Sequence, residues 1–510
     1  KYKADRSTAA PDSSYDVDSW KMQMGYDKII SRQDAATTVV PDFLATNLIL
    51  NTTKPEDNKY FFRPSWIMKT SSCTEHIEWY LYNKFERGSF SQYAYLTDAG
   101  KMVALAEANE DMSEGQKNGY RALEKFIRSY ALYDMTMTMG DIPCSEAGKG
   151  ESEGILSPKY NTQEEVFVEV LNELREASSL FGNAEAFKGD PVYNGDPELW
   201  KRNVNSFTLR VLNSLSKKAT VGSINVRNLF EQVAAEPLMR NEGESYQRVY
   251  DAAKSAQWYP FYYEIQNFWT YPVMSSFLVD MLKDLNDRRL FYYCEPAPSK
   301  SALAPDSYEA YSGVNPLLDF GAVQAEFTEG LHSLLNARYH RVPQGEPVKF
   351  IAYSEIQFIL AEAALRGWKT PASAKEHYEN GVRATMKFTA ENTPEAYNHG
   401  VVIDDAYIND YLAGKAKFNP ANGLEQIMNQ KMLGSFAQLG YTNYFDYRRT
   451  GFPRIPIDPE TNMNEVKTQL PLRWMYPDDE YSRNRENIEE ALARQFGGAD
   501  TPNEVMWLLK

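Results

Sequence analysis

The chain has 510 residues, a formal net charge of −16 and 43% hydrophobic residues, a composition typical of a globular protein built from several domains or one large repeat-based domain. The negative charge and the lack of Lys and Arg clusters exclude nucleic acid as a partner, because polyphosphates are bound by grouped cations. No apolar run is long enough to cross a bilayer, so any membrane attachment must come from a lipid or a partner. The 34 Tyr, 25 Phe and 9 Trp residues favour polar, ring-shaped ligands, since these side chains can be half buried and half solvated.

The first residues, KYKADRSTAAPDSS, contain neither an initiator Met nor an apolar signal core, which indicates a processed product. Cys73, Cys144 and Cys294 are odd in number and widely spaced. They therefore form no disulfide framework or CxxC metal pair, and we expect mostly buried thiols.

Three amphipathic helices are predicted in the first half of the chain. The first covers about 114–139 and ends at Gly140, and the second covers 162–181 and begins with the capping box of Thr162 and Glu165. The third lies within 197–218, where apolar residues recur on one face.

Two more helices are predicted at 348–368 and 371–388, the second with Pro371 in its first turn. Small residues near the end of the earlier helix allow its partner to approach closely. Antiparallel helix pairs with a period of about 34 residues are typical of tetratricopeptide repeats. A last helix is predicted to start with the N-cap pair Asn487 and Glu490 and to end at Gly497.

These elements predict a mainly α protein in which one domain spans 1–510. Its helical scaffold would cover approximately 20–240, 346–396 and 476–510. Two stretches rich in Pro, Gly, Asn and Tyr, approximately 241–345 and 397–475, would be loop-rich inserts that carry the ligand face.

No signature of catalysis is found. The five His residues form no HExxH or i, i+4 pair, and neither a G-x-S-x-G elbow nor a P-loop is present. The run DPETNMNE at 458–465 offers alternating oxygen donors but lacks the Gly and Glu that a calcium-binding EF-hand requires, so a solvated polar turn is the preferred interpretation. The sequence predicts a binding protein with no metal and no cofactor.

Seven blocks of the chain, in this order, resemble the SusD/RagB family of nutrient-binding outer-membrane lipoproteins of Bacteroidetes, more closely its SusD-like branch. The blocks are RALEKFIRSYALYDMTMTMGDIPCSEA, YNTQEEVFVEVLNELREA, LWKRNVNSFTLRVLNSLSKK, VMSSFLVDMLKDLNDRRL, YSEIQFILAEAALRGW, YFDYRRTGFPRIP and LPLRWMYPDDEYSRNRENIEEA. Cys144 and Arg288 depart from the family pattern, as does the absence of the lipidated N-terminal Cys, which we attribute to trimming.

The resemblance implies a scaffold of four tetratricopeptide-like helix pairs with irregular segments packed on it as the ligand face. It also implies a lipid-anchored protein on the outer cell surface that caps a SusC-like TonB-dependent transporter and captures oligosaccharides, or peptides, without cleaving them. Arg448, Arg449, Arg473 and Asn484 lie in these blocks, and we expect them to tie the fold together rather than to bind ligand.

The candidate binding site is the stretch QWYPFYYEIQNFWTYP at 257–272, whose rings follow neither helix nor strand periodicity. Trp258, Tyr259, Trp269 and Tyr271 are predicted to include at least two ligand-stacking rings, with Gln266 and Asn267 as hydrogen-bonding neighbours, although a core plug is the competing interpretation. Sugars fit such a mixture because they present apolar C–H faces and hydroxyl edges.

The leading functional hypothesis is thus a glycan-binding subunit of a SusCD-type uptake complex. Capture of peptides by the same kind of complex and a transporter-docking module without a ligand site remain alternatives. A helical glycoside hydrolase is the alternative from another class, because acidic pairs could serve hydrolysis if the fold opposed two carboxylates.

Overall fold

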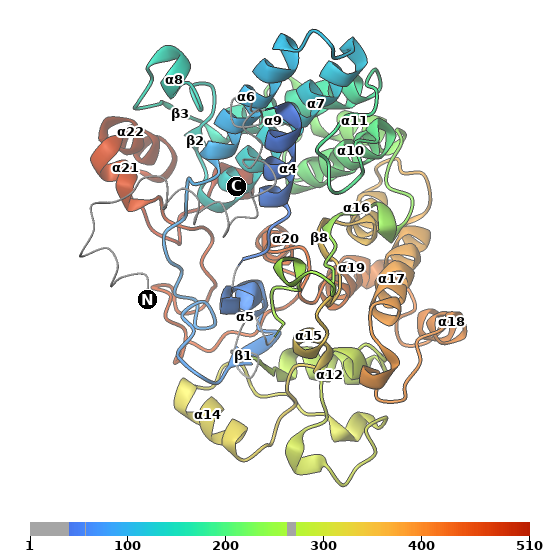
Figure 1. Ribbon diagram of the computed structural model, residues 1–510. Helices are drawn as coiled ribbons and strands as arrows, with labels where there is room; N and C mark the ends of the chain where they lie inside the picture. Colours follow the sequence, from blue (N-terminus) through green and yellow to red (C-terminus); the bar gives the residue numbers. More distant parts are fainter. Residues whose placement is uncertain (1–39, 57, 263–271) are drawn as a thin grey trace, which may run out of the picture.

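A computed structural model describes residues 40–56, 58–262 and 272–510. The protein is mainly α, as predicted, and its short strands form two-stranded pairs between the helices (Figure 1). The start of the predicted scaffold, 20–39, lies outside the described residues.

Helices of the first half of the chain pack side by side in the upper part of Figure 1, where α7 contacts α6 and α9, and α9 contacts α10. In chain order, the elements of the first half are α4 (Pro41–Thr52), η1 (Asn58–Phe62), α5 (Arg63–Ile67), β1 (Ser71–Cys73), α6 (Tyr93–Ala108), α7 (Glu114–Met139), β2 (Ile142–Pro143), α8 (Gly150–Glu153), β3 (Tyr160–Asn161), α9 (Gln163–Phe181), α10 (Pro197–Ser214), β4 (Thr220–Val221), β5 (Ile224–Asn225), α11 (Val226–Ala234), η2 (Glu242–Glu244) and β6 (Tyr246–Arg248). Of these, α5 and β1 lie in the lower half of Figure 1, away from the helical block. The predictions for α7, α9 and α10 are confirmed. Thr162 and Glu165 form the expected capping box, and Gly140 follows the last residue of α7.

The core of this helical block is built around Trp200. Its ring lies 5.3 Å from that of Phe126 on α7, 5.6 Å from that of Phe181 on α9 and 5.7 Å from that of Tyr246 on β6. The indole Nε1 donates a hydrogen bond of 2.7 Å to the carboxylate of Asp190. Trp200 is fully buried, so one side chain joins two neighbouring helices and a strand to its own helix.

The second helix pair begins later than predicted. Residues 348–351 form β8 (Val348–Ile351), which pairs with β6, and only then does α16 (Tyr353–Leu365) start. A short apolar run does not distinguish a buried strand from a helix by periodicity, which is why this boundary was wrong. The predicted place of Pro371 in the first turn of the partner helix is wrong: Ser373 is the N-cap of α17 (Ala374–Glu391) and forms a capping box with Glu376, so the helix starts after Pro371.

The two stretches predicted to be loop-rich also contain helices, and 397–475 is more helical than expected. They hold β7 (Pro272–Met274), α12 (Ser276–Asp284), α13 (Leu290–Tyr293), α14 (Phe320–Thr328), α15 (Arg338–Arg341), α18 (Asp405–Ala413), α19 (Gly423–Gly434) and α20 (Thr442–Thr450). Helix α19 packs against both α16 and α17. The apolar spacing of this helix is weak, since its interior contains buried Gln430 and Lys431.

The last two α-helices lie beside the β2–β3 pair, at the left of Figure 1: α21 (Asp478–Arg483) and α22 (Arg485–Phe496). The 3-10 helix η8 (Trp507–Leu509) follows them. Asn487 lies within α22 and is not its N-cap as predicted, whereas Gly497 ends the helix in the left-handed conformation. None of the described helices combines the length and apolar character that a bilayer crossing requires. The three cysteines are buried, as expected.

A buried ion network joins α16 to α20. The carboxylate of Glu362 binds the guanidinium groups of Arg366 and Arg449, and Arg449 also binds Asp446 at 2.9 Å. Asp446 in turn accepts a hydrogen bond of 2.6 Å from the ammonium of Lys431 on α19. These contacts tie helices of separate sequence blocks together through charges rather than apolar side chains.

The predicted structural roles of the family-block residues are confirmed. Arg448 donates to the carbonyl oxygens of Met137 and Leu472, both at 2.7 Å. Arg473 donates to the carbonyl of Met139 and to Asp500, and Asn484 donates to the carbonyl of Pro158. Together with Arg449, these side chains hold segments that are far apart in the sequence.

His399 links the turn at 398–401 to α13. Its Nδ1 lies 2.7 Å from the carbonyl oxygen of Phe291 and its Nε2 lies 2.8 Å from a carboxylate oxygen of Glu295. Both neighbours are acceptors, so the ring satisfies both only when it is doubly protonated. Burial lowers the pKa of His399, but the carboxylate of Glu295 and the carbonyl of Phe291 outweigh it and raise the pKa above 6.5.

We therefore expect the protonated imidazole to stabilise the fold at low pH. A raised folded-state pKa gives a contribution that is complete below the unfolded-state pKa and is lost as the pH rises through the folded-state value. The stability difference between wild type and His399→Asn should shrink from about pH 6 to about pH 9 in urea denaturation. Asn suits the positive φ of this position. A difference that stays constant over this range would contradict the assignment.

Candidate functional site

The ring-rich stretch at 257–272 is described only at its two ends. Gln266, Asn267, Trp269 and Tyr271 lie outside the described residues, so their predicted roles stay predictions. Within the described part, Tyr259 is fully buried and Trp258 is half-buried.

Tyr259 belongs to the core and does not present a ring face to a ligand. Its ring lies 5.7 Å from that of Phe61 and 5.4 Å from that of Tyr250. On another side the backbone of Gly345 lies so close that a Cβ atom at this position would overlap the ring. For this residue the core-plug interpretation holds, because aromatic side chains bury large areas when packed on all sides.

Trp258 keeps part of its ring accessible. Its indole Nε1 donates a hydrogen bond of 2.8 Å to the carbonyl of Ala252, and its ring meets that of Tyr262 edge-to-face at 5.1 Å. The indole is thus held in one orientation, and a stacking role for Trp258 remains a prediction.

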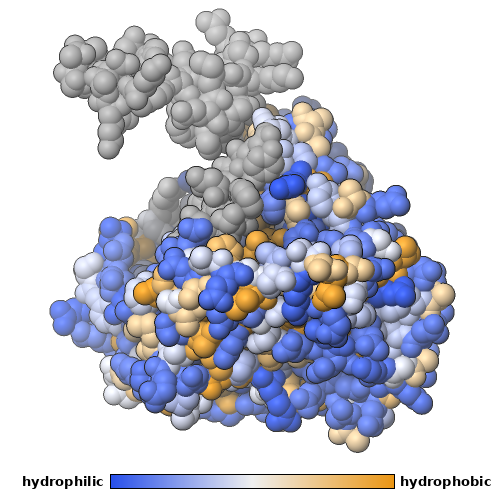
Figure 2. All heavy atoms as spheres, turned by 90° about the horizontal axis from the view of Figure 1, so that it is seen from below, coloured by the Kyte–Doolittle hydropathy of each residue, from blue (hydrophilic) through white to orange (hydrophobic). Residues whose placement is uncertain are grey.

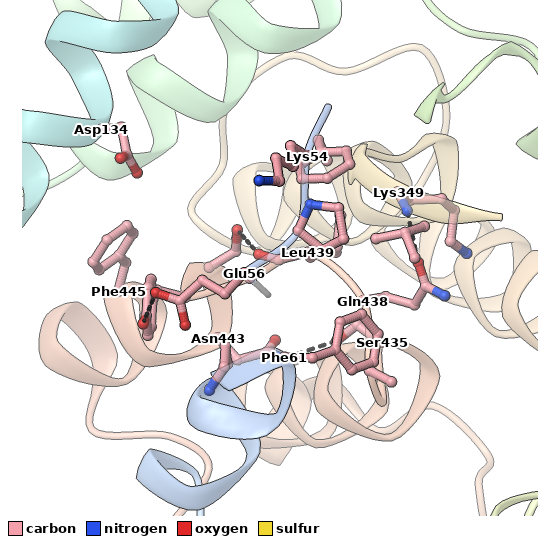
Figure 3. Close-up of a pocket in the computed structure, with 18 of the residues that line it drawn as sticks. Lys54, Glu56, Phe61, Asp134, Lys349, Ser435, Gln438, Leu439, Asn443 and Phe445 are labelled. Carbon is pink, nitrogen blue, oxygen red and sulfur yellow. Dashed lines mark hydrogen bonds between the residues drawn. The ribbon is translucent and has the colours of Figure 1, made fainter. Parts of the chain in front are cut away.

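A cavity of about 350 Å³ lies on the other side of Phe61, where the first helical block meets α5 and the segment before α20 (Figure 3). Its volume lies in the range of small-molecule sites, about 300–1,000 Å³. Its aromatic lining residues are Tyr60, Phe61, Phe62, Tyr95, Tyr130, Tyr133, Phe350, Phe436, Tyr441 and Phe445. Its ionisable lining residues other than Tyr are Lys54, Glu56, Asp134, Arg210 and Lys349.

The predicted stretch supports the wall of this cavity. Phe61 lines the cavity and contacts the rings of Tyr259 and Phe261 behind it, at centroid distances of 5.7 and 6.2 Å. Phe62 contacts Phe261 edge-to-face at 4.8 Å. The rings of Tyr259 and Phe261 therefore continue the aromatic wall of the cavity on its outer side.

Two carboxylates face the cavity. Asp134 projects from α7 toward the space that Lys54 and Glu56 also face in Figure 3. Burial raises the pKa of Asp134, although a hydrogen bond of 2.5 Å from the amide of Gln92 opposes this effect. Burial also raises the pKa of Glu56, while the guanidinium of Arg63, at 3.0 Å, lowers it.

Two cations of the lining are already held by carboxylates behind the wall. Arg210 binds Glu355 at 2.5 Å, and Lys349 binds Glu242 at 2.5 Å. Lys54 is exposed on the segment that follows α4. The cavity combines ring faces with hydrogen-bonding groups, an arrangement suited to holding a polar, ring-shaped molecule in a defined orientation.

Sequence reasoning did not find this cavity, because its lining comes from segments near residues 51–70, 91–95, 130–134, 348–350 and 432–445 and from Arg210. One local signal was present. Asp134 is a lone carboxylate in the otherwise uncharged run SYALYDMTMTM of α7. Such a residue on a largely buried helix requires a partner or a polar space beside it.

Among the described residues, fewer large aromatic side chains are exposed on the outer surface than line the cavity. Figure 2 shows hydrophobic residues in small groups among hydrophilic ones on the face that it views. Among described residues, Phe43, Tyr60 and Trp79 are the exposed large aromatic side chains. The ring of Trp79 is covered on one side by the ammonium of Lys84, at 4.6 Å, so we regard the cavity as the stronger candidate site.

Comparison with known proteins agrees with this architecture. The family model SusD-like, described as starch-binding and associating with the outer membrane, matches residues 33–477. A SusD homologue from Bacteroides fragilis is 39% identical with a TM-score of 0.88, covering 92% of this chain and 100% of its own. A second one from the same species is 31% identical with a TM-score of 0.81, covering 93% and 100%.

A chitin-binding protein that is 22% identical, with a TM-score of 0.72 over 91% of this chain and 98% of its own, shares the fold. No curated protein matches the sequence. The family match covers most of the chain, and the structural matches cover nearly all of it. This chain belongs to the SusD-like family of nutrient- or carbohydrate-binding outer-membrane proteins.

Proposed function

We propose that this protein is the cell-surface, lipid-anchored glycan-binding subunit of a SusCD-type uptake complex. It captures oligosaccharides for import by a SusC-like TonB-dependent transporter and does not cleave them. The observation that carries the proposal is the cavity, where the rings of Tyr60, Tyr95 and Tyr130 border the polar groups of Gln92 and Asp134. Sugar rings need both kinds of contact at once.

The ring-rich stretch extends this proposal toward the surface. Trp258 is held with part of its ring accessible, and Gln266, Asn267, Trp269 and Tyr271 follow it in the sequence. We propose that these residues contact the part of a longer glycan that leaves the cavity.

Peptide capture and glycoside hydrolysis are the competing functions. A peptide would also use rings and carboxylates, and a hydrolase would use Asp134 and Glu56 as its acid pair. Titration calorimetry against oligosaccharides and oligopeptides, with the same mixtures assayed for cleavage products, separates the three. Glycan binding without new reducing ends supports the proposal, and cleavage at enzymatic rates would refute it.

The transporter partner is tested separately. Coexpression with the neighbouring SusC-like transporter and pull-down should recover a complex. An active transporter that never co-purifies with this chain would contradict the proposed partnership.

Two single variants locate the ligand. We expect Tyr95→Ala to weaken glycan binding by roughly 1–3 kcal/mol, taking base–aromatic stacking as the nearest scale, because Tyr95 is a half-buried lining ring. Unchanged affinity in Tyr95→Ala, with a retained melting temperature, would remove the cavity from the proposal.

Trp258→Ala should weaken binding of long glycans and leave short ones unaffected, since Trp258 lies outside the cavity lining.

A further inference from the structure

We infer, resting on the proposed function, that the cavity selects neutral glycans over acidic ones and that Asp134 determines this selection. Three observations support the inference. They are the carboxylate of Asp134 in the cavity lining, the hydrogen-bonding capacity left on neighbouring groups, and the pairing of lining cations with carboxylates of the protein. It specifies the chemical class of sugar that the site accepts.

Asp134 lies in the last third of α7 and is half-buried. Within the described chain its carboxylate makes one hydrogen bond, with the amide of Gln92, and no ion pair. A carboxylate can accept several hydrogen bonds, so most of its capacity is open to a ligand in the cavity.

Other lining groups also retain hydrogen-bonding capacity. One carboxylate oxygen of Glu56, Oε1, accepts hydrogen bonds from Arg63 and from the hydroxyl of Tyr441. The other oxygen, Oε2, has no hydrogen bond among the described residues. Tyr95 and Tyr130 also line the cavity, and their hydroxyls have no hydrogen bond among the described residues. Tyrosine hydroxyls can donate or accept, and carboxylates only accept when ionised.

Most of the lining cations that could bind an anionic sugar already form ion pairs with carboxylates of the protein. Arg210 is bound to Glu355 and to the carbonyl of Phe350, and Lys349 is bound to Glu242. The remaining lining cation, Lys54, is exposed. Two carboxylates, Glu56 and Asp134, therefore face the cavity, while two of its three lining cations, Arg210 and Lys349, are neutralised by carboxylates that do not line it.

This arrangement suits a neutral sugar. Neighbouring hydroxyls of one ring can both donate to the Asp134 carboxylate, forming charge-assisted hydrogen bonds. A uronic acid or sulfate would bring a second negative charge into the same half-buried space, where like charges repel strongly. Selection then arises from repulsion of the wrong ligand as much as from attraction of the right one.

The test compares matched sugars. Hexasaccharides of glucose, galactose and mannose are titrated beside the same compounds with their C6 hydroxymethyl groups oxidised to carboxylates. We expect the wild type to bind the best neutral compound at least about tenfold more tightly than its acidic counterpart at about pH 7. Asp134→Asn should reduce this ratio to threefold or less, because the amide keeps the shape and removes the charge.

Asp479→Asn is the matched control, since Asp479 is exposed on α21 and, among the described residues, has Arg483 as its one ion-pair partner, at 3.7 Å. It should leave the ratio unchanged. Lys54→Gln should keep or increase the ratio. Melting temperatures of all variants show whether each remains folded.

Equal or tighter binding of the acidic sugars by the wild type would overturn the inference while leaving glycan capture intact. An unchanged ratio in a folded Asp134→Asn variant would also overturn the role of Asp134. If Asp134→Asn does not fold, the wild-type ratio alone decides the selectivity. Binding of none of these sugars, neutral or acidic, by a folded wild type would refute both the proposed function and the inference.

Discussion

Arg449→Met is expected to lower the free energy of unfolding by about 3–5 kcal/mol, the usual cost of leaving a buried charge without its partner. Arg449 is nearly fully buried and binds both Glu362 and Asp446. The Met side chain fills part of the same space but provides no donor. Urea denaturation followed by circular dichroism measures the difference.

Arg454→Met provides the matched control. Arg454 also pairs with a glutamate, Glu425, but its side chain is 73% exposed. Exposed ion pairs contribute about 0–1 kcal/mol, so this variant should unfold close to wild type. A loss in Arg449→Met as small as the one expected for Arg454→Met would show that the network joining α16 to α20 does not stabilise the fold.

The same network predicts an acid dependence. Burial raises the pKa of Glu362, but Arg449 and Arg366 outweigh it and hold the pKa at about 2, below the ordinary 4.5. A depressed folded-state pKa gives stability that is present above the unfolded-state value and is lost as the pH falls toward the folded-state value. The difference between wild type and Arg449→Met should therefore shrink between pH 4.5 and about 2.

Trp200→Ala is expected to cost about 3–5 kcal/mol of stability, as for other buried aromatic residues replaced by Ala. The change removes a ring packed against Phe126, Phe181 and Tyr246. It also removes the indole donor to Asp190, whose carboxylate then keeps, within the described chain, the backbone N–H donors of Val192, Tyr193 and Gly195. The midpoint of urea denaturation should fall accordingly.

Trp79→Ala serves as the control for this change, because Trp79 is 39% exposed. Its midpoint should stay close to that of the wild type, since surface substitutions usually change stability by less than about 0.5 kcal/mol. A small loss in Trp200→Ala would mean that the helices around Trp200 close over the space, which would contradict its central role in the core.

The helix boundaries that local chemistry decides could be read from the sequence. The capping box of Thr162 and Glu165 and the Gly after α7 mark helix ends in a way that depends on neighbouring backbone groups only. Pairing partners could not be read in this way. Residues 348–351 form a strand because they pair antiparallel with β6, which lies about a hundred residues earlier in the chain.

In the candidate site, too, the sequence predicted one feature and could not predict another. The sequence identified a dense ring segment but could not tell a packed ring from a displayed one, since both are Tyr or Trp. Tyr259 is buried because Phe61 and Gly345 arrive on either side of it from distant segments. The cavity was missed because its lining residues meet only after folding.

The sequence alone determined the mainly α fold and its long helices, because periodicity and caps are local properties of the chain. It predicted structural roles for Arg448, Arg449, Arg473 and Asn484, whose partners the tertiary structure supplied. Only the tertiary structure decided which rings are buried and where Asp134 faces. Burial and the opposition of charges depend on contacts between distant residues, so the local sequence around Asp134 signals a need for a polar neighbour but not which residues face it.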